Sequence, residues 1–168
     1  MRIDLKKLSG VYGSKIPFAG QADLSAEAVY GEYPFQQPVQ YEGEIVNHLG
    51  VLKLTAGVQA VYSTHCARCL KPLDVPLEAQ VETVLSREGE EEDEVFLLTE
   101  DTVEVEDVLI PELLLQVRMT YLCKEDCKGL CPVCGADRNV TACTCESKQV
   151  DPRLAALAAL LGDKKDPN

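Results

Sequence analysis

The chain has 168 residues, a formal net charge of -12 and 46% apolar residues. A chain of this length can bury a hydrophobic core, so it does not depend on disulfide bridges to fold. The first ten residues, MRIDLKKLSG, lack the apolar stretch of a secretory signal, and the longest apolar run, LAALAALL at 154–161, is too short to span a bilayer. We therefore expect a cytoplasmic protein with no membrane partner, in which clustered cysteines indicate metal or redox sites before disulfides.

The first part of the chain, residues 1–117, is predicted to form a β-rich domain. A short strand is expected at the start, in MRIDL, and β signals continue from about 16 to 85. Apolar residues alternate with polar ones most clearly at 51–65 and 75–85, as in strands with one buried face. We predict two long antiparallel strands there, with CARC at 66–69 at or near the turn that joins them.

Most of the negative charge lies in residues 83–117, which hold one arginine and 12 acidic residues. The charge is densest in EGEEEDE at 88–94. We interpret residues 86–94 as a solvated acidic loop that keeps the protein soluble. A second interpretation, in which this segment docks a basic partner such as a ribosomal protein, stays open.

A helix is predicted beyond the acidic loop, over residues 107–117, after a short strand candidate at 95–98. Asp107 would cap the helix, and Pro111 would be tolerated because it lies near the first turn. Apolar residues surround the helix on almost all sides, so we expect it to be buried against the sheet.

The last part of the chain, residues 118–168, is predicted to be a cysteine-rich module. It would end in a second helix at about 152–161, which Asp151 and Pro152 would begin. The predicted fold class is therefore α+β, with an antiparallel, barrel-like β-sheet, a buried helix and a C-terminal cysteine-rich zinc module.

The eight cysteines form four close pairs, which are Cys66 and Cys69, Cys123 and Cys127, Cys131 and Cys134, and Cys143 and Cys145. Structural zinc takes four thiolates in a tetrahedron, and a C-x-x-C spacing lets one tight turn supply two of them. Gly135 suits the turn in CPVCG because glycine accepts a positive φ, and Pro132 fixes its backbone. All eight cysteines are candidate ligands of one or two structural zinc ions.

The spacing leaves the grouping of the thiols open. In one arrangement Cys131 and Cys134 join Cys143 and Cys145, and the remaining four cysteines clamp the hairpin tip onto the module. In another arrangement four to six thiols bind metal and the others are free. His65, beside Cys66, could replace a thiolate, although a lone histidine at a strand end is more often structural.

Other chemistries of clustered cysteines fit this sequence less well. A thioredoxin-like C-x-x-C lies at the start of a helix in a βαβ unit, whereas CARC is followed by a second strand. A catalytic cysteine needs a base, and neither His48 nor His65 is placed to serve as one. Four-thiolate zinc sites are closed, and catalytic zinc keeps an open position. We expect a protein that is not an enzyme and has no small-molecule substrate, with a thiol oxidoreductase as a distant alternative.

Several of these segments together resemble the YceD family of large-ribosomal-RNA-accumulation proteins. They are CARCL at 66–70, LLLQVRMTYLC at 113–123, CKGLCPVCG at 127–135, the C-x-C at 143–145 and DPRLAALAALL at 151–161. The family usually reads Asn-Leu-Asn shortly after the knuckle glycine, where this chain has Asp137, Arg138 and Asn139. Some members lack most of these cysteines, which favours a structural role for the metal.

The resemblance implies a non-enzymatic ribosome-biogenesis factor that supports accumulation or processing of large-subunit (23S) ribosomal RNA. The implied partner is the precursor of that RNA, a large-subunit ribosomal protein, or both. Direct RNA binding would use basic residues in and near the module, namely Arg68, Lys71, Arg118, Lys124, Lys128 and Arg138. The alternative is a protein-interaction module that holds a basic ribosomal protein through the acidic segment.

Overall fold

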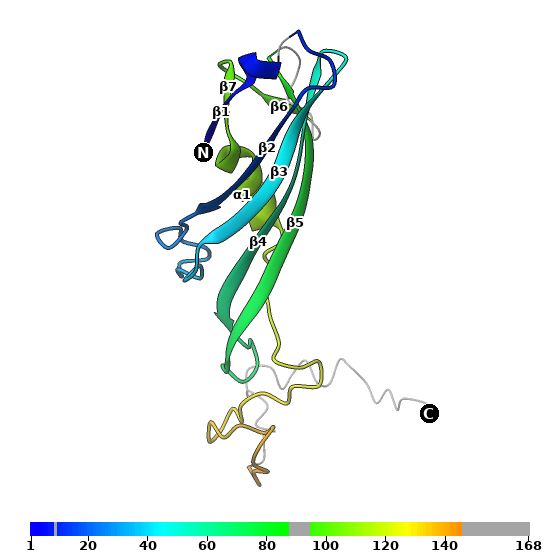
Figure 1. Ribbon diagram of the computed structural model, residues 1–168. Helices are drawn as coiled ribbons and strands as arrows, with labels where there is room; N and C mark the ends of the chain where they lie inside the picture. The colour runs from blue at the N-terminus through cyan, green and yellow to red at the C-terminus, as the bar shows by residue number, and fades with distance from the viewer. Residues whose placement is uncertain (9, 88–94, 146–168) are drawn as a thin grey trace, which may run out of the picture.

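A computed structural model of the chain describes residues 1–8, 10–87 and 95–145 (Figure 1). Its elements, in chain order, are β1 (Arg2–Asp4), the 3-10 helix η1 (Leu5–Leu8), β2 (Lys15–Ala22), β3 (Val39–His48), β4 (Val51–His65), β5 (Pro72–Ser86), β6 (Val95–Leu97), β7 (Thr102–Glu104) and α1 (Val105–Leu115). The main sheet has the strand order β2-β3-β4-β5-β6, and β1 pairs with β7 in a second, two-stranded sheet. Figure 1 shows a long main sheet that curls around α1.

The main sheet is mostly antiparallel, as predicted, but it is not a closed barrel. It curls like half a barrel, and β2 and β6 form its two edges. The pair β5 and β6, at one edge of the sheet, is parallel, with Val84 opposite Val95. The prediction of a wholly antiparallel sheet is therefore wrong at this edge.

The β4–β5 hairpin confirms the two long strands that the alternation predicted. Its antiparallel register runs from Leu52 opposite Leu85 to His65 opposite Pro72. Alternate residues of both strands are buried, among them Leu54, Val58 and Val81. One face of the hairpin therefore belongs to the core, and its far end carries the CARC turn (Figure 1).

Helix α1 packs against β4 and β5. It starts at a different residue from the one that was predicted. It starts at Val105, directly after β7, and Val105 and Val108 are buried in its first turn. Glu104 precedes it without a side-chain cap, so the predicted cap at Asp107 is wrong. Pro111 is the seventh residue of the helix and not in its first turn.

Burial of the helix is confirmed for one side. Its core-facing residues are Val105, Val108, Leu109 and Leu113. Leu115, in contrast, is 75% exposed, although its side chain is apolar. The predicted helix at about 152–161, and nearly all of the acidic loop at 86–94, lie outside the described residues. Within the ranges that the structure describes, no helix is long and apolar enough to cross a membrane.

Three aromatic rings connect the core to the cysteine-rich segment. Tyr62, near the end of β4, lies 5.7 Å from Phe35 and 5.5 Å from Tyr121, measured between ring centroids. Tyr121 stands two residues before Cys123, and its carbonyl accepts a hydrogen bond of 2.9 Å from the backbone N–H of Ala67. This contact brings the segment that follows α1 alongside the hairpin turn.

Candidate metal centres

Two turns of the same backbone geometry present the two C-x-x-C pairs. In the β4–β5 turn, the N–H of Cys66 donates to the carbonyl of Lys71, and the N–H of Leu70 donates to the carbonyl of Cys66. In the CPVCG turn, the N–H of Cys131 donates to Ala136 and that of Gly135 to Cys131 in the same pattern. The prediction of a tight turn in CPVCG is confirmed.

The residue after the second cysteine has a positive φ in both turns. Gly135 has a φ of 72° and Leu70 a φ of 59°. Glycine reaches this region without a steric cost, whereas a leucine there is strained. The first turn thus adopts the same backbone shape with a less favourable residue, which the sequence did not reveal.

The eight thiols gather into two groups of four. The hairpin site consists of Cys66, Cys69, Cys123 and Cys127, and the distal site of Cys131, Cys134, Cys143 and Cys145. Within each site all four sulfur atoms lie within 4.8 Å of one another. The first of the two arrangements left open by the spacing is therefore the one that the structure contains. His65 is exposed and belongs to neither group.

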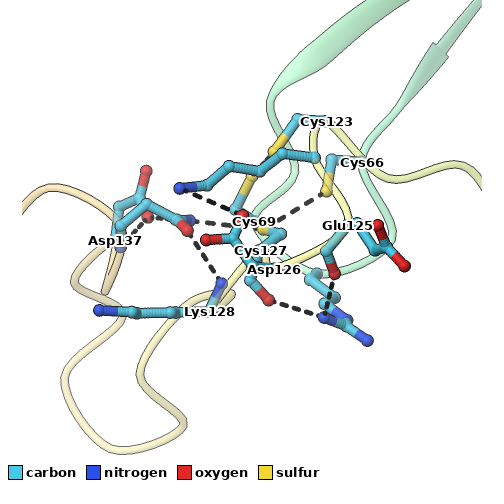
Figure 2. Close-up of polar contacts among 11 residues, drawn as sticks. Cys66, Cys69, Cys123, Glu125, Asp126, Cys127, Lys128 and Asp137 are labelled. Atoms are coloured by element: carbon cyan, nitrogen blue, oxygen red, sulfur yellow. Dashed lines mark hydrogen bonds and ion pairs between the residues drawn. The ribbon is translucent and has the colours of Figure 1, made fainter.

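The sulfur geometry fits a tetrahedral metal ion. The Sγ atoms of Cys66 and Cys127 are 3.8 Å apart, and those of Cys69 and Cys123 are 3.6 Å apart (Figure 2). A zinc ion with bonds of about 2.3 Å separates its ligand sulfurs by about 3.8 Å. A disulfide would bring two sulfurs to about 2.05 Å, and all eight cysteines are free. Both sites could hold a metal ion.

Backbone N–H groups prepare thiols of both sites to carry negative charge, and the pKa of Cys127 is lowered as well as those of Cys66 and Cys131. Burial raises the pKa of Cys66, but N–H groups of Cys123, Cys69 and Arg68 outweigh it and lower the pKa to about 6. The N–H groups of Cys134 and Val133 likewise lower the pKa of Cys131 to about 6. An N–H group stabilises a thiolate and not a thiol, so the turns favour the ligating form.

One other thiol of each site resists ionisation strongly. Burial, followed by the thiols of Cys127 and Cys69, raises the pKa of Cys123 to about 12. The adjacent Cys134 thiol, followed by burial, raises the pKa of Cys145 to about 12. Four thiolates this close together repel one another, and a bound divalent cation offsets that repulsion.

The two sites differ in exposure. Three hairpin-site thiols, those of Cys66, Cys69 and Cys127, are buried and form a small cluster with Leu73 and Leu130 packed against it. In the distal site Cys131 is buried, whereas Cys134 is exposed. The hairpin site is therefore enclosed by the protein, and the distal site lies at the surface of the module.

Arg68 joins the hairpin turn to the segment that carries Cys127. Its guanidinium donates hydrogen bonds to the carbonyl of Cys127, at 2.8 Å, and to that of Glu125, at 3.3 Å. Its own carbonyl accepts a hydrogen bond of 3.0 Å from the N–H of Leu130. Arg68, predicted as an RNA contact, is thus engaged in holding the module together.

The other predicted RNA contacts are exposed, and one of them is paired. Lys124 lies 3.6 Å from the carboxylate of Asp126. The remaining four, Lys71, Arg118, Lys128 and Arg138, form no side-chain ion pair within residues 1–8, 10–87 and 95–145. The structure therefore leaves four of the six predicted basic side chains open to a partner.

Asn139 contributes to the site, and the sequence reasoning missed it. Its side-chain amide donates to the Sγ of Cys127, at 3.4 Å, and to the carboxylate of Asp137, at 2.7 Å. Its side-chain oxygen accepts a hydrogen bond from the N–H of Lys128. The signal available in the sequence was the Asp-x-Asn spacing, which is typical of an Asx turn.

The sequence of this chain matches a known family over most of its length. The family model described as "Large ribosomal RNA subunit accumulation protein YceD" matches residues 54–161. The chain belongs to the YceD family. The resemblance seen in the sequence is thereby confirmed, and the matched YceD region extends from β4 through all eight cysteines.

Curated relatives agree with membership in the YceD family. An uncharacterized protein of Mycobacterium tuberculosis (strain ATCC 25618 / H37Rv) is 32% identical over 123 residues, which are 70% of this chain and 58% of the relative. The uncharacterized protein YlbN of Bacillus subtilis is 33% identical over 100 residues, or 57% of this chain and 58% of YlbN.

A plant relative carries the family name. The chloroplastic YCED homolog 1 of Arabidopsis thaliana, a large ribosomal RNA subunit accumulation protein, is 25% identical over 77% of this chain and 50% of its own length. The chain thus spans 58% or less of these three relatives. No solved structure matches the chain.

Proposed function

We propose that the protein is a non-enzymatic ribosome-biogenesis factor that supports accumulation or processing of 23S ribosomal RNA in the cytoplasm. Membership in the YceD family carries this proposal, because the family is described by large-subunit ribosomal RNA accumulation. The two four-thiol sites support the non-enzymatic part. When bound there, zinc would supply a tetrahedral cross-link between chain segments, and four thiolates leave it no open position for a substrate.

The cysteines of both sites would hold that zinc, with the hairpin site fastening the module to the sheet. Cys66 and Cys69 come from the β4–β5 turn, whereas Cys123 and Cys127 follow α1. The N–H groups around Cys66 and Cys131 hold these thiols in the form that binds metal. The proposed role of the metal is therefore to fix the exposed surface of the module, with no part in a reaction.

Direct RNA binding by the module alone would be weak. Arg68 and Lys124 are engaged within the module, which leaves Lys71, Arg118, Lys128 and Arg138 for phosphate contacts. Eight thiolates with two divalent ions add a further charge of about -4 to the same region. We therefore propose that tight association requires an assembly particle or a ribosomal protein in addition to RNA.

One observation favours a basic protein as that partner. The outer face of the main sheet carries four glutamates, which are Glu42, Glu44, Glu78 and Glu82. Lys15 and Lys53 pair with Glu44 and Glu82, so the face stays net acidic. An acidic face repels phosphate and attracts lysine-rich and arginine-rich proteins. The second candidate function is therefore an interaction module that holds a basic ribosomal protein.

The test replaces the chain in cells of its own species by variants and measures the ratio of 23S to 16S ribosomal RNA. We expect Cys66→Ser with Cys69→Ser to lower this ratio as strongly as deletion of the gene. The matched control, Ser63→Ala with His65→Ala in the same hairpin, should keep it. A normal ratio without the protein would contradict the proposed function.

A further inference from the structure

Asn139 lies in the loop of the distal site, but its side chain contacts the hairpin site. It belongs to the loop between Cys134 and Cys143, which are both ligands of the distal site. Its side-chain amide nevertheless donates a hydrogen bond to Cys127 Sγ of the hairpin site. The two sites therefore share this residue, although they share no ligand.

The loop around Asn139 is held against the hairpin-site segment at several further points. The N–H of Arg138 donates to the carbonyl of Gly129, and Leu130 and Asp137 form an antiparallel bridge. Asn139 also accepts a hydrogen bond of 2.9 Å from the N–H of Lys128, the residue after Cys127. Figure 2 shows Lys128 and Asp137 beside the four hairpin-site cysteines. The distal-site loop is thus packed onto the segment that begins with Cys127 of the hairpin site.

Asp137 fixes the orientation of the Asn139 side chain. Its carboxylate accepts hydrogen bonds from both the backbone N–H of Asn139, at 2.8 Å, and the side-chain amide, at 2.7 Å. The amide group is therefore held with its N–H toward sulfur and its oxygen toward the Lys128 N–H. A hydrogen bond to a ligand sulfur stabilises the thiolate and orients it for the metal.

We propose that Asn139 couples the two sites, so that metal in the distal site strengthens metal binding in the hairpin site. Metal in the distal site closes the loop from Cys134 to Cys143 and holds Asn139 against Cys127. By linkage, metal in the hairpin site strengthens the distal site by the same factor. Asn139 is a positioning residue in this scheme, and the inference rests on the proposed structural role of zinc.

The experiment measures zinc occupancy of each site separately in the full chain, by nuclear magnetic resonance during competition with a chelator. The amide resonances of Leu70 and Gly135 report the hairpin and distal sites. The distal site is disabled by Cys143→Ser with Cys145→Ser, in the starting chain and in Asn139→Ala. Loss of one partner around a ligand typically lowers metal affinity by about tenfold or more.

We expect disabling the distal site to weaken zinc binding at the hairpin site about tenfold in the starting chain, and less than twofold in Asn139→Ala. The matched control is Arg138→Ala, an exposed neighbour in the same loop, which should keep the tenfold effect. Should Asn139→Ala lose its module structure, Asn139→Asp tests the same point. It keeps an acceptor for the Lys128 N–H and lacks the donor to sulfur, so it should also lose the coupling.

An effect of the same size with and without Asn139 would overturn the inference, and so would no effect in the starting chain. Both results would leave the structural role of zinc in place, because zinc would still occupy both sites of the starting chain. Absence of zinc from the folded chain would overturn that role together with the coupling. Unchanged resonances of β2–β5 in every variant establish that the sheet is intact.

Discussion

Two glycines of the cysteine-rich segment have the same backbone conformation in different surroundings. Gly129 has a φ of 69° and Gly135 a φ of 72°. A Cβ atom on Gly129 would lie 2.9 Å from the carbonyl oxygen of Arg68, whereas a Cβ atom on Gly135 would meet nothing within 4 Å. Gly129 is therefore required both for its φ and for the close approach of the hairpin turn.

This difference predicts unequal effects of the same substitution. Gly135→Ala should cost about 1–2 kcal/mol, the steric cost of a positive φ. Gly129→Ala should cost more, because the added methyl group also separates Leu130 from Arg68. The measurement is zinc retention by the folded protein at increasing chelator concentration. Equal retention by the two variants would show that the approach of the two segments is not tight.

At this scale the sequence identified the candidate ligands but not the residues that support them. The C-x-x-C spacings and Gly135 were readable, because a metal-binding turn is a local structure. The contacts of Asn139 were not, because they depend on how the distal loop folds back onto Cys127 and Lys128. The crowding at Gly129 was not either, because it arises where that residue meets Arg68 of the hairpin turn, about sixty residues earlier. Spacing could not choose between the two groupings of thiols for the same reason.

At the scale of elements, the main sheet depends on a close contact between β3 and β4. A Cβ atom on Gly43 would lie 2.4 Å from the carbonyl oxygen of Thr55 and 2.6 Å from the Ala56 Cβ. A Cβ atom on Gly57, in contrast, would have the flexible side-chain amide of Gln80 as its nearest neighbour, at 3.2 Å. A side chain at Gly43 would therefore force β3 and β4 apart.

We therefore expect Gly43→Ala to lower the free energy of unfolding by about 1–3 kcal/mol, the usual cost of overpacking. Gly57→Ala is the matched control in the next strand, and it should change the free energy by less than about 1 kcal/mol. Urea unfolding followed by circular dichroism measures both values. A larger loss in Gly57→Ala would contradict this account of the sheet.

Strands with a regular alternation of apolar and polar residues were predictable from the sequence. Features that depend on packing against distant parts of the chain were not. The alternation in β4 and β5 follows from one buried face, so both strands and their turn were located correctly. The start of α1 was misplaced because Asp107 was taken as its cap, whereas the helix begins at Val105 after Glu104, which forms no side-chain cap. The parallel pairing of β6 depends on where the chain returns to the sheet, which no local pattern specifies.

At the scale of the whole molecule, the described part of the chain contains two apolar clusters of very different size. The large one lies between the sheet and α1, and the small one consists of Cys66, Cys69 and Cys127 with a few neighbours. The small cluster has three buried residues, so it contributes little apolar burial to the segment from 121 to 145. Metal binding would then contribute directly to the stability of this part.

A strong chelator should therefore unfold residues 121–145 and leave the sheet folded. Hydrogen exchange provides the measurement, with fast exchange expected at Leu130 and Gly135 and continued protection in β3 and β4. A control chain with both sites disabled should exchange at these positions as fast as the chelated protein. Protection that survives complete removal of metal would contradict this expectation.

The long separation in sequence between the two halves of the hairpin site has a consequence for the order of folding. Its candidate ligands come from 66–69 and 123–127, whereas those of the distal site all lie within 131–145. Closing a short loop costs less conformational entropy and occurs sooner than joining distant segments. Metal should therefore enter the distal site first on refolding, and stopped-flow cobalt absorption of chains with one site disabled can compare the two rates. The hairpin site, completed last, would then report that β5, the second sheet and α1 are already in place.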